Sequence, residues 1–176
     1  MAEAELEDTG NGKIPADDGW IIKNLADMEW GKVEGGGTWS AWETKERHSK
    51  TLGWGVHVLW PGDAPGMYHA ESEQEGFLVL SGECIAIVEG QERRMRQWDY
   101  LHSPPGTAHI TIGAGDEPCA IFMLGARNAG APIHYDPDPI AAKYGAAVKE
   151  PADSAREAYA DQDRTYTPVK DPWPGT

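Results

Sequence analysis

The hydrophobic positions of this chain fall into short runs, each bounded by turn-forming residues. Residues 54–60 show the pattern most clearly. In an extended strand the two tryptophans and two valines of this run share one face, whereas His57 and Leu59 share the other. We expect further strands over 38–42, 76–80, 84–88, 93–96, 99–103, 109–112 and 120–124. Short strands at this regular spacing predict an all-β barrel or sandwich.

Changes in composition divide the chain into three parts. Residues 1–19 are acidic and rich in glycine without any hydrophobic period, so we expect a mobile acidic N-terminal arm. The barrel is expected over residues 20–126. Residues 127–176 are expected to form an extension that packs on the barrel or on a partner subunit.

The C-terminal extension contains the signals of two short helices. Asp138 suits the N-cap position ahead of Pro139, and Gly145 suits the C-terminal end of the same helix. Asp153 is expected to cap a second helix that runs to Ala160. The fold prediction is therefore an all-β barrel with a short helical C-terminal extension.

Charge and cysteine content narrow the possible partners and location. Lys and Arg total 15 and Asp and Glu total 29, for a formal net charge of −14, which repels nucleic-acid phosphates. No apolar run approaches the ~20 residues of a membrane span. The first residues are acidic and lack the apolar stretch of a secretory signal. Cys84 and Cys119 lack CxxC spacing, and we expect a cytoplasmic protein with reduced thiols.

Two histidines stand beside carboxylates in contexts that favour metal binding. His69 and Glu71 lie two residues apart and would share one face of a strand. Glu75 begins the next expected strand, and His109 begins a later strand after a Pro-Pro-Gly bend. Two imidazoles and one or more carboxylates that converge inside a small barrel would make a site for a divalent first-row metal.

The same two segments resemble the two motifs of the cupin superfamily. The first motif, G-x5-HxH-x3,4-E-x6-G, is matched by His69, Glu75 and Gly82. The second motif, G-x5-PxG-x2-H-x3-N, is matched by Pro104, Gly106 and His109. Each half alone is only moderately specific, but both occur here in the correct order. The resemblance covers roughly residues 52–125.

The resemblance implies a double-stranded β-helix, the small jelly-roll barrel, with a metal deep inside and one open end. It also implies that His69, Glu75 and His109 bind this metal. Glu71 stands where the family has its second histidine, which makes it a candidate fourth ligand or a catalytic base, and Glu73 competes with it. An extra carboxylate favours Mn²⁺ or Fe²⁺, and Zn²⁺ remains compatible.

The resemblance further implies a metal-dependent enzyme of the dioxygenase, isomerase or lyase type that acts on a small organic substrate as a homodimer. Because a fold does not fix a function, a non-catalytic small-molecule binding or sensor barrel is the alternative. The two hypotheses differ in metal dependence: an enzyme should lose turnover with Glu75→Gln, whereas a binder should keep its ligand without metal.

Other residues near the motifs carry weaker hypotheses. His57 is a candidate catalytic acid–base group on a strand beside the first motif, although such a histidine is more often packed or exposed. His102 is a similar candidate, for which packing or exposure is again the more common role. Trp98 and Gly113 replace the first Gly and the final Asn of the second motif. Core packing is the expectation for most of four tryptophans, Trp39, Trp42, Trp54 and Trp60.

Overall fold

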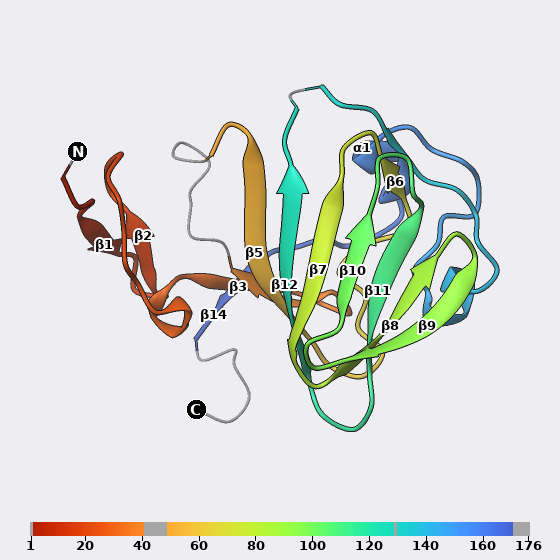
Figure 1. The fold of residues 1–176 in the computed structure, drawn as a ribbon, viewed down its shortest axis with the longest axis horizontal. Coiled ribbons are helices and arrows are strands. Elements are labelled where there is room, and N and C mark those ends of the chain that lie inside the picture. The colour runs from red at the N-terminus through yellow and green to blue at the C-terminus, as the bar shows by residue number, and fades with distance from the viewer. Residues whose placement is uncertain (1, 41–48, 129, 171–176) are drawn as a thin grey trace.

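The computed structural model describes residues 2–40, 49–128 and 130–170, and it is built mainly from antiparallel strands (Figure 1). The larger sheet has the strand order β10-β7-β12-β5-β4-β3-β14. Its strands are β3 (Trp30–Val33), β4 (Gly37–Ser40), β5 (Leu52–Leu59), β7 (Glu75–Ser81), β10 (Tyr100–Ser103), β12 (Cys119–Ala126) and β14 (Thr167–Val169).

A smaller sheet with the order β11-β8-β9 faces the larger one. Its strands are β8 (Glu83–Val88), β9 (Gln91–Arg96) and β11 (His109–Ala114). Two strand pairs lie outside these sheets: β1 (Leu6–Asp8) with β2 (Lys13–Pro15), and β6 (Ala70–Glu71) with β13 (Ile133–His134). The antiparallel strands of the two facing sheets confirm the predicted jelly-roll barrel.

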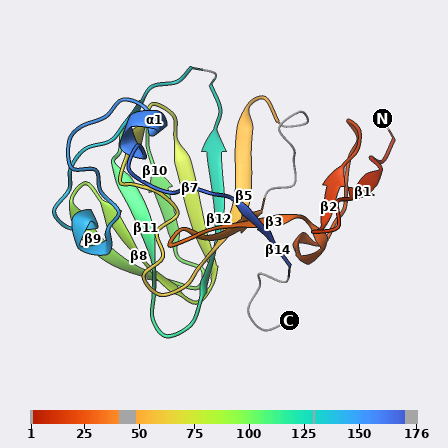
Figure 2. The same cartoon turned by 180° about the vertical axis from the view of Figure 1, so that it is seen from behind.

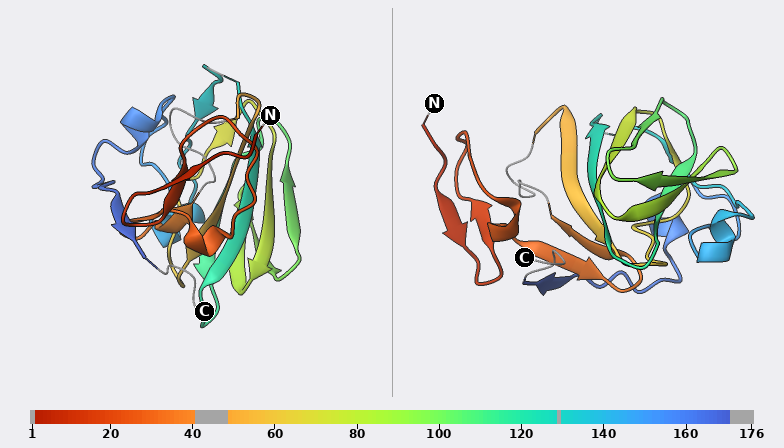
Figure 3. Two further views of the ribbon diagram at one scale, coloured as in Figure 1. Left: turned by 90° about the vertical axis from the view of Figure 1, so that its left-hand side faces the viewer. Right: turned by 60° about the horizontal axis from the view of Figure 1, so that its bottom comes forward.

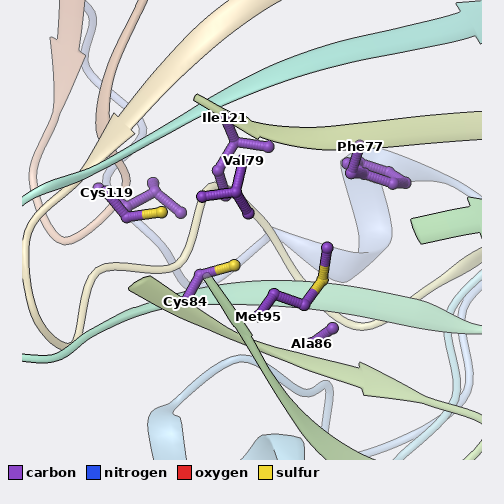
Figure 4. Packing of buried hydrophobic residues seen from close by; sticks show 8 residues of the cluster. Phe77, Val79, Cys84, Ala86, Met95, Cys119 and Ile121 are labelled. Carbon is purple, nitrogen blue, oxygen red and sulfur yellow. The ribbon is translucent and has the colours of Figure 1, made fainter. Parts of the chain in front are cut away.

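Side chains that alternate along each strand fill the space between the two sheets. Figure 4 shows this core. It contains Leu59, Phe77, Val79, Cys84, Ala86, Met95, Cys119 and Ile121. Both cysteines are free and fully buried, as expected for small apolar residues in strands. His57 shares its face of β5 with Leu59 and lies opposite Ile121 of β12.

The outer face of the larger sheet is covered only in part. Trp30, Val56 and Val58 pack together there and are buried. Trp54 and Trp60 occupy the same face of β5 but remain 40% and 37% exposed. Core packing was thus the wrong expectation for these two tryptophans. It was also wrong for Trp39, which is 39% exposed and lies opposite His57 on the other face, with its ring 5.7 Å from that of Tyr166. Trp42 lies outside the described residues.

The N-terminal segment forms the β1–β2 hairpin, which projects to one side of the barrel (Figure 3). A short 3-10 helix, Leu25–Asp27, leads from this segment toward β3. The mobility expected for residues 1–19 and the domain boundaries expected at 19–20 and 126–127 stay predictions.

The extension after β12 contacts both sheets. The 3-10 helix η2 (Ala141–Tyr144) covers the outer face of the smaller sheet, where Ala141 packs with Ile87 and Ile112. The N-cap residue is Ile140 rather than the expected Asp138, whose Oδ1 accepts from the backbone N–H groups of Ile140 and Ala141 at 2.9 and 2.7 Å.

The second helix and the last strand follow η2. The helix α1 (Ala155–Ala158) is capped by Ser154 rather than by Asp153, because the Ser154 hydroxyl accepts from the backbone N–H of Glu157. Strand β14 then pairs with β3, as Figure 2 shows from behind. No helix in the described ranges is long and apolar enough to cross a membrane.

Candidate metal centre

Three side chains from separate segments converge at one end of the barrel: His69, Glu75 and His109. One potential ligand atom from each lies within 4.8 Å of the others. His69 precedes β6, Glu75 begins β7 and His109 begins β11. The two histidines are joined by reciprocal backbone hydrogen bonds of 3.2 and 2.8 Å, which hold their side chains next to each other. The structure therefore brings together three of the four expected ligands.

Backbone carbonyls fix the orientation of both imidazole rings. His69 Nδ1 lies 2.7 Å from the carbonyl oxygen of Met67, and His109 Nδ1 lies 3.0 Å from that of Thr107. The Ser103 hydroxyl is also 3.1 Å from His109 Nδ1. Because a carbonyl can only accept, the proton is on Nδ1 and the lone pair of each ring is on Nε2. Both Nε2 atoms thus face the centre as a metal would require.

Glu75 supplies the clearest sign that this cluster fits a cation. Its Oε2 is buried and has no hydrogen-bond partner among the described residues. The same oxygen lies 3.1 Å from Nε2 of His109, whose side chain is only 3% exposed. A buried carboxylate oxygen is costly unless it is paired, so a cation between these atoms would satisfy both. Imidazole nitrogens with a carboxylate oxygen suit Mn²⁺, Fe²⁺ and Zn²⁺.

Glu71 lies at the rim of the cluster rather than inside it. Its Oε1 is 3.7 Å from Nε2 of His69, and its side chain is 34% exposed. The nearby His69 imidazole lowers the pKa of Glu71. Burial alone would lower the pKa of His69, but the Glu71 carboxylate and the Met67 carbonyl outweigh it, so this pKa is raised. Glu71 is thus adjacent to the three convergent residues without belonging to that close group.

The other acidic, histidine and tyrosine side chains near the two motifs lie outside the centre. Glu73 Oε1 accepts a hydrogen bond of 3.1 Å from the Asn128 side chain. His102 and Tyr100 are exposed on the outer face of β10. Tyr68 is buried, but its hydroxyl accepts from the backbone N–H of Gly90 at 3.1 Å. None of these belongs to the close group of ligand atoms in the described chain.

His57 lies inside the barrel but outside the close group of ligand atoms. Its Nδ1 is buried and has no hydrogen-bond partner among the described residues. Burial, together with the nearby charge of Arg164, lowers the pKa of His57 to about 4. The imidazole is therefore neutral near pH 7 and offers a polar group that the fold itself leaves unused.

Sequence reasoning missed two tyrosines of the C-terminal extension. The ring of Tyr135 lies 5.6 Å from that of His69, and the ring of Tyr159 lies 5.9 Å from that of Tyr135. The Tyr159 hydroxyl accepts a hydrogen bond of 3.0 Å from the backbone N–H of Met67, whose carbonyl orients His69. No local pattern marks either tyrosine, since both are far from the motifs along the chain.

Comparisons with known proteins show which family and which solved structures this chain resembles. Residues 55–125 match the family model described as "Cupin domain". No curated protein matches the chain. Among solved structures, KdgF from Halomonas sp. is 20% identical with a TM-score of 0.51, over 60% of this chain and 94% of that protein.

Two further structures show similar identity and lower structural agreement. A sugar phosphate isomerase from a cupin superfamily, from Silicibacter pomeroyi, is 24% identical with a TM-score of 0.46 over 49% of this chain. This chain spans 57% of the length of that protein, little more than half. A Cupin 2 conserved barrel domain protein from Salinispora arenicola is 21% identical with a TM-score of 0.43, over 49% of this chain and 71% of that protein. The facing antiparallel sheets and the family match agree, and residues 55–125 carry a cupin domain.

Proposed function

We propose that this chain is a metal-dependent enzyme that holds Mn²⁺, Fe²⁺ or Zn²⁺ through His69, Glu75 and His109 and acts on a small organic substrate. The observation that carries the proposal is the buried, unpartnered Glu75 Oε2 beside two imidazoles whose Nε2 lone pairs face it. Chemistry of the dioxygenase, isomerase or lyase type is compatible with this donor set. A bound ion would supply Lewis-acid or redox chemistry in a water-poor site.

The protein's own groups have defined parts in this proposal. Carbonyls of Met67 and Thr107 hold the imidazole protons on Nδ1, which keeps both Nε2 lone pairs available. Glu71 is the fourth ligand or, from its rim position 3.7 Å from His69 Nε2, the base that takes a proton from substrate. Its lowered pKa keeps Glu71 ionised at neutral pH, as either part requires.

Elemental analysis of purified protein tests the proposal. We expect close to one first-row metal per chain in the parent, and its loss in His109→Ala. The control is His102→Ala, which removes an exposed histidine from β10 and should leave the metal content unchanged. Glu75→Gln, which keeps the shape but removes the charge, should weaken metal binding at least tenfold.

The result would decide between the two hypotheses for the barrel. Metal-free protein, even after reloading with Mn²⁺, Fe²⁺ and Zn²⁺, would refute the enzyme proposal. The non-catalytic small-molecule barrel would then be the better hypothesis. If metal is present, its identity selects the assays: iron leads to oxygen-dependent reactions, and manganese or zinc to isomerase and lyase reactions.

A further inference from the structure

The segment 159–166 of the C-terminal extension, here called the strap, lies against residues 65–67, just ahead of His69. The Tyr159 hydroxyl accepts from the backbone N–H of Met67 at 3.0 Å. Arg164 Nη2 donates to the carbonyl oxygen of Pro65 at 3.1 Å. Gly66 makes this contact possible, since a Cβ at that position would lie 2.8 Å from the Tyr159 hydroxyl oxygen. The strap is thus attached to the residue whose carbonyl orients His69.

A row of side-chain contacts, tilted or edge-to-face where two rings meet, runs from the candidate metal centre to the strap. The ring centroids of His109 and His69 are 5.1 Å apart, and those of His69 and Tyr135 are 5.6 Å apart. Tyr159 follows at 5.9 Å, and the Arg164 guanidinium carbon lies 4.7 Å from the centroid of the Tyr159 ring. A positive charge therefore terminates a row of rings that begins at the metal centre.

Arg164 is not neutralised by an acidic side chain within the described ranges. No ion pair involves it there, and the adjacent Asp163 carboxylate instead accepts from the backbone N–H of Thr165 at 2.9 Å. A guanidinium has five N–H donors, and only one contact, to Pro65, uses a protein acceptor. An uncompensated cation is notable in a chain with a net charge of −14.

Space for a small molecule adjoins this cation. A groove of about 830 Å³ runs between the strap and the loop before β6, and Arg164 and Met67 both line it. Pockets of roughly 300–1,000 Å³ accommodate small organic ligands. Arg164 is exposed along this groove, and its charge contributes to lowering the pKa of the buried His57 of β5.

We propose that Arg164 is a specificity-determining residue that binds the anionic group, carboxylate or phosphate, of a small molecule that enters this groove beside the loop before the candidate metal centre. This inference rests on the proposed function. A guanidinium suits this task, since its planar fork can pair two N–H donors with two oxygens of a carboxylate or phosphate. The strap, although remote from both sequence motifs, thereby selects acidic substrates.

The test uses the full chain loaded with Mn²⁺ and three probes of similar size: malonate, glycerol phosphate and the neutral malonamide. Isothermal titration calorimetry measures the Kd of each probe. For Arg164→Gln we expect at least a tenfold weaker Kd for malonate, glycerol phosphate or both, and less than a twofold change for malonamide. Arg164→Lys should restore part of the anion affinity. The anion that responds identifies the group that is recognised.

Two control variants separate charge recognition from attachment of the strap. Arg156→Gln removes the same charge from exposed α1 and should leave all three Kd values within twofold. Tyr159→Phe loses the hydrogen bond to Met67 but keeps a ring beneath Arg164, and it should lower the melting temperature while preserving the preference for anions. Equal weakening of anions and malonamide by Arg164→Gln would show a purely structural role and overturn the inference.

Measurements in EDTA distinguish the two proposals. An anion affinity that depends on Arg164 in EDTA would support the anion site independently of the metal. Failure of the protein to take up metal on reloading would refute the metal proposal alone. Normal metal content with anion affinities that are the same in the parent and Arg164→Gln would refute the anion site alone.

Discussion

At the residue scale, the candidate metal centre depends on where two imidazole protons lie. Carbonyls of the main chain, at Met67 and Thr107, hold those protons on Nδ1 and leave both Nε2 atoms free to bind. Because main-chain carbonyls provide this orientation, it survives many side-chain changes around the site. At this centre, Glu75 Oε2 is the buried side-chain atom that the described residues leave without a hydrogen-bond partner.

Trp98 illustrates strain at a single residue. The family motif has glycine at this position, and Trp98 adopts a left-handed backbone with φ of 73° while its side chain is 70% exposed. A residue with a Cβ pays roughly 1–2 kcal/mol for this conformation. We predict that Trp98→Gly is about 1 kcal/mol more stable than Trp98→Ala in urea unfolding. Both variants lose the indole, so equal stabilities would show that the backbone is not strained.

His57 predicts how stability depends on pH in metal-free protein. The folded chain protonates this imidazole only near pH 4, whereas the ordinary value of 6.5 applies to the unfolded chain. Between these values the unfolded state binds more protons, so folding stability falls as pH drops from 6.5 to 4 and is unaffected by this group above 6.5.

The size of this effect can be measured by comparison with His57→Gln. We expect the parent to lose at most about 3 kcal/mol from this group across the window, and the variant to lack that component of the acid slope. Urea titrations at several pH values give both slopes, and NMR of the imidazole gives the pKa directly. Parallel slopes, or a His57 that titrates near 6.5, would contradict the prediction.

At the scale of elements, close approach between strands and loops sets which residues are tolerated. Gly113 of β11 occupies the position of the final Asn in the second motif, and a Cβ there would lie 2.0 Å from the carbonyl oxygen of Trp60. The same glycine donates its N–H to the Asp63 carbonyl at 2.9 Å. The loop after β5 is therefore held directly against β11.

This contact predicts a large effect for Gly113→Ala. The obstructing atoms are backbone, which cannot move aside cheaply, so we expect a loss of about 2 kcal/mol or more in the free energy of unfolding. Gly125→Ala in β12 is the matched control, since a Cβ there would lie an ordinary 3.5 Å from Glu75 Cγ. Thermal or urea unfolding measures both stabilities. Equal stability of Gly113→Ala and Gly125→Ala would contradict the predicted clash between Gly113 and the loop after β5.

At the scale of the whole molecule, the candidate metal centre joins segments that are far apart in sequence. The histidines belong to two motifs, Tyr135 of the C-terminal extension contacts His69, and the strap contacts Met67 ahead of His69. Strand β14 secures the end of this extension by pairing with β3. An ion bound only in the folded state should consequently stabilise the entire fold.

We predict that saturating Mn²⁺ or Zn²⁺ raises the melting temperature of metal-free protein. At a free metal concentration 100 times Kd, the added stability is about 2.7 kcal/mol. EDTA should reverse the shift, and lowering the pH should diminish it because protons compete for the imidazoles. His109→Ala should show no shift, whereas the exposed-site control His102→Ala should respond like the parent. A shift that is the same in all three would indicate binding elsewhere.

The sequence by itself determined strands β4, β5 and β7–β12 and three of the residues that converge, whereas β1–β3, β6, β13 and β14 were not predicted. Alternation along residues 54–60 correctly separates the two faces of β5, and the spacing of the motifs correctly selects His69, Glu75 and His109 for one end of the barrel. These features are local: side-chain alternation and turn chemistry act within a few residues, so a linear pattern records them.

Only the tertiary structure decided which groups surround those three residues. It placed Glu71 at the rim, left Trp54 and Trp60 partly exposed, and brought Arg164 to the segment that precedes His69. The physical reason is that burial and charge contacts depend on which distant segments pack against a given face of the barrel. No local sequence pattern records contacts between segments that are far apart in the chain. The strap is the clearest case. Its Arg164 contacts Pro65, although the two residues are 99 positions apart in the sequence.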